Sequence, residues 1–156
     1  MRDDLALIRQ AALDAGQLAM DMRKDGLKTW SKEGGSPVTN ADIAVDTLLK
    51  ERLMAARPDY GWLSEETADD PARLGKQRLF VVDPIDGTAA YMKDKPWFSV
   101  AIAVVEAGRP VAGVVHAPAL DETYDAISGG GAGRVASAAR RARLPRPPPW
   151  FPPDPR

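Results

Sequence analysis

The sequence contains no cysteine and a single histidine. Without cysteine, disulfides, thiolate metal sites and a cysteine nucleophile are excluded. One histidine also excludes a zinc site built from several histidines. No stretch approaches the roughly 20 apolar residues of a membrane-spanning helix. The N-terminus is charged and then amphipathic, without the apolar core of a signal peptide. We therefore expect a soluble, cytoplasmic protein.

Neither sign of charge dominates, since the net charge is -1 and 28% of the residues are charged. This composition is that of a globular domain, and it does not indicate a nucleic-acid or membrane-surface protein. A length of 156 residues allows one domain with a proper core. The distribution is uneven, because residues 134–156 carry six arginines against one acid and residues 145–156 hold seven of the 14 prolines. We expect a folded domain over residues 1–132 and a disordered Ala/Arg/Pro-rich tail over residues 133–156.

Apolar periodicity predicts an α+β fold with layered helices and an antiparallel sheet. Residues 3–24 and 40–56 have the spacing of amphipathic helices, and Thr39 is placed to cap the second. Residues 62–64 and 79–82 are predicted as strands, and residues 27–38 as a flexible polar loop. Residues 96–106, 111–116 and 122–127 predict three strands joined by tight turns, that is, an antiparallel meander.

The most informative stretch is Asp83-Pro84-Ile85-Asp86-Gly87-Thr88, which follows the apolar strand. Pro84 fixes one backbone dihedral and Gly87 permits a sharp turn, so Asp83 and Asp86 can aim at one point. Acids at turns are usually caps or solvated residues. Here two carboxylates end an apolar strand before Gly-Thr, which favours a Mg²⁺ site in which the Ile85 carbonyl is a third oxygen ligand.

Gly87 and Thr88 are predicted to begin a short helix. Their backbone amides could hold an anion such as phosphate. The alternative is that Thr88 merely caps this helix.

Phosphatases of the haloacid dehalogenase type offer a competing interpretation, because they carry Asp-x-Asp-Gly-Thr with the first aspartate as covalent nucleophile. In this chain Pro84 occupies that position. The sequence therefore excludes a covalent aspartate mechanism.

Four segments in order make the chain resemble the inositol monophosphatase superfamily from residue 3 to about residue 131. These segments are Ser36-Pro37-Val38-Thr39 with Ala41-Asp42, Leu63-Ser64-Glu65-Glu66, Asp83 to Thr88, and Pro96 to Ala103. The Leu-Ser-Glu-Glu form and the turn at residues 117–119 are most similar to the 3′(2′),5′-bisphosphate nucleotidase branch. The resemblance implies the layered fold of that superfamily, with its C-terminal part missing.

The resemblance also implies a set of metal ligands. Glu65, Asp83 and the Ile85 carbonyl would hold one Mg²⁺, Asp83 and Asp86 would bridge towards a second, and Glu65 would serve a third. Glu66 either supports these ligands or is simply solvated. The loop over residues 32–36 matches the segment that closes over the metals in the family.

Catalytic roles are implied in the same way. Thr88, hydrogen-bonded to Asp42, would help Glu65 and the metals to polarise the attacking water, and the Gly87 and Thr88 amides would hold the phosphate. The expected function is a Mg²⁺-dependent phosphomonoesterase resembling 3′(2′),5′-bisphosphate nucleotidases. The alternatives are an inositol-1-monophosphatase, or a catalytically impaired fragment that only binds metal and phosphate. The expected partner is a small phosphorylated substrate, not a nucleic-acid polymer or a membrane.

One family motif is absent from this sequence. The second half of the family's catalytic unit normally supplies a Trp-Asp whose aspartate completes the second metal site. The four tryptophans here are followed by Ser31, Leu63, Phe98 and Phe151. We therefore expect weak binding of the second metal. We also expect a meander with an uncovered apolar face, which favours a homo-oligomer.

Overall fold

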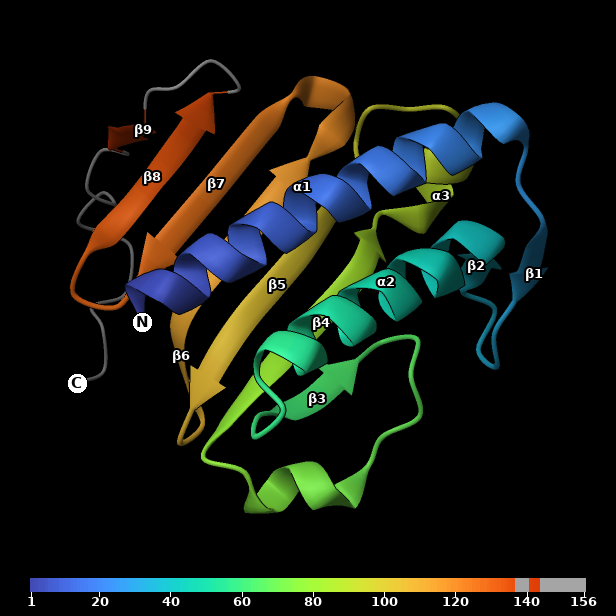
Figure 1. Ribbon diagram of the computed structural model, residues 1–156. Helices are drawn as coiled ribbons and strands as arrows, with labels where there is room; N and C mark the ends of the chain where they lie inside the picture. Colours follow the sequence, from blue (N-terminus) through green and yellow to red (C-terminus); the bar gives the residue numbers. More distant parts are fainter. Residues whose placement is uncertain (137–140, 144–156) are drawn as a thin grey trace.

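The computed structural model describes residues 1–136 and 141–143. Its two long helices pack on one face of a seven-stranded sheet (Figure 1). The helices are α1 (Arg2–Asp25), α2 (Asn40–Ala56) and α3 (Thr88–Met92), with short 3₁₀ turns η1 (Pro71–Gly75) and η2 (Pro118–Leu120). The strands are β1 (Thr29–Ser31), β2 (Pro37–Thr39), β3 (Gly61–Ser64), β4 (Arg78–Asp86), β5 (Ser99–Glu106), β6 (Arg109–Ala117), β7 (Glu122–Ile127), β8 (Gly131–Ala136) and β9 (Arg141–Arg143).

The strands of the large sheet lie in chain order, β3 to β9. β3 is parallel to β4, and every later neighbour is antiparallel, so the predicted meander is confirmed. Parallel strands end at the same edge of a sheet. Ser64 pairs with Val82, and this register places Glu65 beside Asp83.

The core lies between the sheet and the two long helices. Alternate residues of β4 to β6, including Phe80, Val82, Ile102 and Val114, are buried with apolar residues of α1 and α2. The intervening residues, such as Val81 and those at 101, 103 and 115, belong to the other face and are partly or largely exposed. Among the described residues, no helix covers that second face (Figure 1).

Both long helices form where the apolar periodicity predicts them. Thr39 caps α2 in a capping box, because its side chain accepts from the Ala41 and Asp42 amides while the Asp42 carboxylate accepts from the Thr39 amide. The predicted layered α+β fold is therefore confirmed for the described part of the chain.

Two segments differ from the sequence prediction. The expected loop over residues 27–38 contains the β1–β2 hairpin, in which Trp30 pairs with Val38. β1 has only three residues and all of them are exposed, so neither its length nor a buried face distinguishes it from a loop. The expected boundary at residue 132 falls inside β8, which continues the sheet and pairs with β9. The rest of the expected tail, residues 137–140 and 144–156, lies outside the described residues.

Within residues 1–136 and 141–143, no helix is both long and apolar enough to cross a bilayer.

The single histidine, His116, holds α1 against the sheet. Its side chain is buried on β6, and Nδ1 shares a 2.9 Å hydrogen bond with Thr123 Oγ1. Burial lowers its pKa, so the ring is neutral at pH 7. Gly16 of α1 lies directly over this ring, since a Cβ built there would be 2.5 Å from His116 Cδ2.

Gly16→Ala should therefore destabilise the fold although alanine is the better helix former. We expect the free energy of unfolding to fall by about 1–3 kcal/mol from overpacking, against a propensity gain of about 1 kcal/mol. Urea unfolding measures this difference, and Gly75→Ala, where the new Cβ meets nothing within 4 Å, is the control. A Gly16→Ala variant that is more stable than the wild type by the full propensity gain of about 1 kcal/mol would contradict the close contact.

Candidate functional site

β4 does not end at Val82 as the sequence suggests, but continues to Asp86 through an irregularity. Asp83 pairs with Ala101 and Asp86 with Ser99, and the register shifts between the two pairs. Pro84 lies in this interval and has no amide hydrogen to leave unpaired. In a regular strand, residues three apart point to opposite faces, whereas a bulge changes the phase of the side chains. The bulge thus permits both aspartates to serve one site.

Asp83 lies at the centre of a group of acids. Burial raises its pKa to about 7, and the negative charges of Glu65, Asp86 and Asp42 add to the effect. Its Oδ1 atom is buried and has no hydrogen-bond partner among the described residues. A buried carboxylate oxygen without a donor is costly, and a bound cation would remove that cost.

Asp42 joins α2 to the end of β4. Its Oδ2 accepts hydrogen bonds from the Thr39 amide at 2.8 Å and from Thr39 Oγ1 at 2.6 Å. Its Oδ1 lies 3.0 Å from Thr88 Oγ1, the contact that the family resemblance implies. The Thr88 hydroxyl is also 3.0 Å from the Ile85 carbonyl oxygen. Because a hydroxyl has one hydrogen, it donates to Asp42 or to Ile85 at any moment.

Gly87 makes the turn from β4 into α3. Its φ of +87° lies in the left-handed region, where a side chain would be strained. A Cβ there would also lie 2.7 Å from the Trp97 carbonyl oxygen. Glycine at this position therefore allows Thr88 to begin α3 beside Asp42.

The two adjacent glutamates have different surroundings. The Glu65 side chain is 56% exposed, whereas that of Glu66 is 6% exposed. Lys32, from the turn between β1 and β2, places Nζ 2.6 Å from Glu66 Oε1 and 3.7 Å from Glu65 Oε1. Burial raises the pKa of Glu66, and the lysine offsets part of that rise. Glu66 is thus an ion-paired residue and not a solvated one.

Lys32 is the contact that sequence reasoning missed. Burial lowers its pKa, but the hydrogen bond and charge of Glu66 outweigh this, so the net pKa is raised and the ammonium stays charged. The lysine therefore holds the β1–β2 hairpin over the acids. The family resemblance implies that the loop over residues 32–36 lies over the metal site, but a separation of 34 residues from Glu66 gave no sign of this particular ion pair.

The atoms around Asp83 are oxygen donors, but they are not arranged as a metal site. Within the described ranges, no group of three or more Asp, Glu or His side chains is placed so that it could hold a metal ion. The residues near Asp83 nevertheless offer only oxygen ligands, which Mg²⁺ prefers. The unpartnered Asp83 oxygen is the one feature that a cation would complete directly.

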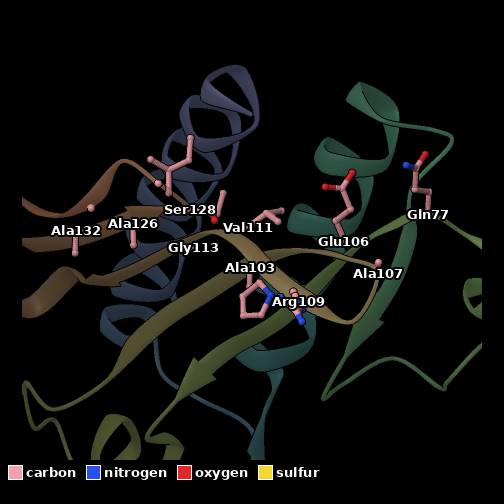
Figure 2. Close-up of a pocket in the computed structure, with 15 residues that line it drawn as sticks. Gln77, Ala103, Glu106, Ala107, Arg109, Val111, Gly113, Ala126, Ser128 and Ala132 are labelled. Atoms are coloured by element: carbon pink, nitrogen blue, oxygen red, sulfur yellow. The ribbon is translucent and has the colours of Figure 1, made fainter. Parts of the chain in front are cut away.

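A large cavity lies away from these acids. It measures about 1250 Å³ and is lined by Ala103, Glu106, Arg109, Gly113, Ala132 and their neighbours at the β5–β6 turn (Figure 2). Arg78 pairs with Glu106, so this cavity is at the opposite end of β4 from Asp86. A smaller groove of about 460 Å³ on the uncovered face reaches Asp83. The acids decide the location of the site, because the large cavity is lined mostly by small, unreactive side chains.

The chain is similar in sequence to known proteins. Residues 2–144 match the model of the inositol monophosphatase family. The chain is 44% identical to the 3′(2′),5′-bisphosphate nucleotidase CysQ of Salmonella typhimurium over 131 residues, which is 80% of this chain and 52% of that protein. It is 37% identical to a histidinol-phosphatase of Chlorobaculum parvum over 85% of this chain and 51% of that protein.

A solved structure also has this fold. The extragenic suppressor protein SuhB of Bartonella henselae superposes with a TM-score of 0.82 and 31% identity, covering 93% of this chain and 55% of SuhB. The chain thus spans about half the length of the relatives it matches.

The raised pKa of Asp83 predicts a pH dependence of stability in EDTA. The folded value of about 7 lies above the value of about 3.9 for an unfolded aspartate. Between these values the folded chain binds the extra proton, so the free energy of unfolding should fall as the pH rises from about 4 to about 7. Asp83→Asn should reduce this slope, because the amide cannot ionise.

Urea unfolding between pH 4 and 8 measures the slope. Asp59→Asn, at an exposed acid before the start of β3, is the control and should keep the wild-type slope. Equal slopes for Asp83→Asn and the wild type would contradict the crowding of carboxylates around Asp83.

Proposed function

This chain belongs to the inositol monophosphatase family, and from that premise we propose that it serves as a Mg²⁺-dependent phosphomonoesterase for a small phosphate ester. The observation that carries the proposal is the buried, unpartnered oxygen of Asp83 among the acids Glu65, Asp86 and Asp42. A site with this much negative charge binds a phosphate only if cations neutralise it.

We assign the metal ligands to the end of β4 and the residue after β3. Glu65, Asp83, Asp86 and the carbonyl oxygen of Ile85 would hold Mg²⁺. When bound, Mg²⁺ lowers the pKa of coordinated water and neutralises charge on the phosphate. The burial of Asp83 and the bulge at Pro84 support this assignment, because they fix two of the ligands before any metal binds.

The pair of Thr88 and Asp42 would orient the attacking water. When the Thr88 hydroxyl donates to the buried Asp42, a lone pair of Thr88 Oγ1 is available to a water proton. Water would attack phosphorus directly, since Pro84 leaves no aspartate two residues before Asp86 to act as nucleophile. As the new P–O bond forms, the P–O bond to the ester oxygen would break, and the leaving alcohol would take up a proton from solvent. The Gly87 and Thr88 amides at the start of α3 would hold phosphate oxygens.

For the substrate, we propose a 3′(2′),5′-bisphosphate nucleotide. The 44% identity to the Salmonella nucleotidase supports this choice. Inositol 1-phosphate is the alternative, which the family model supports. We further propose a cytoplasmic location and self-association through the uncovered sheet face.

A second candidate function is binding of metal and phosphate without turnover. The observation that favours it is the missing Trp-Asp motif, because none of the four tryptophans precedes an aspartate.

Phosphate release separates these candidates. We expect the purified chain with Mg²⁺ to release phosphate from adenosine 3′,5′-bisphosphate faster than from inositol 1-phosphate or histidinol phosphate. Asp86→Asn should lower kcat/KM at least by the roughly 10–100-fold that even indirect metal contacts cost. Asp59→Asn is the matched control and should keep the wild-type rate.

The remaining outcomes are equally distinct. Faster hydrolysis of inositol 1-phosphate would replace the nucleotide assignment. A chain that hydrolyses none of the three, yet melts at higher temperature with Mg²⁺, would have the binding function only. Activity that is unchanged in Asp86→Asn or in EDTA would contradict the metal site itself.

A further inference from the structure

Asp46 of α2 is a buried acid that the proposed mechanism does not use. The spacing of the apolar residues in α2 predicts that Asp46 lies on the polar side of the helix, together with Lys50 and Glu51. In the structure only 6% of its surface is exposed. A buried carboxylate requires donors, so its partners show what it holds.

Both partners come from the segment that carries the two glutamates. Ser64 Oγ donates to Asp46 Oδ1, and Thr67 Oγ1 donates to Asp46 Oδ2. Ser64 is the last residue of β3, and Thr67 follows three residues later. One carboxylate therefore binds the chain immediately before Glu65 and immediately after Glu66.

Further hydrogen bonds tie the two hydroxyl groups to the backbone and the sheet. Ser64 Oγ accepts from the Glu66 amide at 3.3 Å, and Thr67 Oγ1 accepts from Trp62 Nε1 at 3.3 Å. The Glu65 amide donates to the Val82 carbonyl at 3.3 Å. Hydrogen bonds to a carboxylate acceptor are stronger than bonds between neutral groups, so the two bonds that Asp46 accepts contribute most to holding this network together.

We propose that Asp46 is a positioning residue: through Ser64 and Thr67 it fixes the conformation in which Glu65 is presented to Asp83 and Glu66 to Lys32. The inference rests on the proposed function, in which Glu65 is a metal ligand. The Glu65 side chain is 56% exposed and its Oε1 lies 3.7 Å from Lys32 Nζ, so the backbone direction at residue 65 limits which positions its carboxylate can reach.

Asp42 and Asp46 lie one helical turn apart on α2, and they hold the two sides of the site. Asp42 contacts Thr88 after β4, while Asp46 contacts the residues after β3. Two like charges at this spacing repel each other. Hydrogen-bond donors offset that repulsion: Asp42 accepts from Thr39 and Thr88, and Asp46 accepts from the Ser64 and Thr67 hydroxyls. Thr88, Ser64 and Thr67 belong to the segments being positioned.

Asp46→Ala and Thr67→Val test this role, the second removing only one hydroxyl. In metal-free solution, we expect amide hydrogen exchange at Glu65 and Glu66 to become at least about 10-fold faster, while amides of β5 stay protected. The Mg²⁺ dissociation constant from calorimetry should rise by about 10–100-fold. Asp46→Asn, which keeps one acceptor oxygen, should show a smaller change in both quantities.

Asp4→Asn is the matched control. Asp4 is also a buried acid, but it contacts Arg57 and Tyr60 at the other end of β3. This variant should melt at lower temperature and yet keep the wild-type exchange at residues 65–66 and the wild-type Mg²⁺ affinity.

Unchanged exchange at Glu65 and Glu66 in both Asp46→Ala and Thr67→Val would overturn the inference. So would a loss of Mg²⁺ affinity no larger than that of Asp4→Asn at equal loss of stability. If the wild-type chain binds no Mg²⁺, the proposed function fails, and the exchange rates still decide whether Asp46 holds this segment. Should Asp46→Ala not fold, Thr67→Val and Asp46→Asn carry the same comparison.

Discussion

Repulsion between the carboxylates at the end of β4 is the constraint that the surrounding contacts must offset. Burial and three neighbouring acids raise the pKa of Asp83 to about 7. Such a cluster opposes folding unless other contacts hold it, because like charges in a partly buried place repel strongly. The same cluster gives a cation a large gain on binding. Stability without metal and affinity for metal are therefore opposite consequences of one arrangement.

The contacts that hold the acids come from elements far apart in the chain. The bulge at Pro84 changes the directions of the Asp83 and Asp86 side chains. The parallel pairing of β3 with β4 brings Glu65 alongside Asp83. The Lys32 ammonium lies over the two glutamates. The first two turns of α2 contribute Asp42 and Asp46. α2 thus packs its apolar face on the sheet and uses two buried acids to position the loops at the edge.

The sequence predicted the parts of this arrangement that have a local pattern. The long helices, the meander and the acids of the Asp-Pro-Ile-Asp-Gly-Thr turn follow from periodicity and from known preferences of proline and glycine. The hairpin β1–β2 and the strands β8 and β9 have no such pattern. All residues of β1 are exposed, and β8 and β9 are short and rich in glycine, alanine and arginine. The contacts of Asp46 and Lys32 were also hidden, because their partners lie 18 to 34 residues away. Such pairs are fixed by tertiary packing and not by spacing along the chain.

The central claim is that these acids converge on one cation, and crystals soaked in Mn²⁺ test it most directly. Mn²⁺ shares the preference of Mg²⁺ for oxygen ligands, and its anomalous scattering locates it. We expect an anomalous peak within coordination distance of Asp83 Oδ1, with Glu65 or Asp86 as a further ligand. A saturating soak that leaves no peak at Asp83, or places the ion elsewhere on the chain, would contradict it.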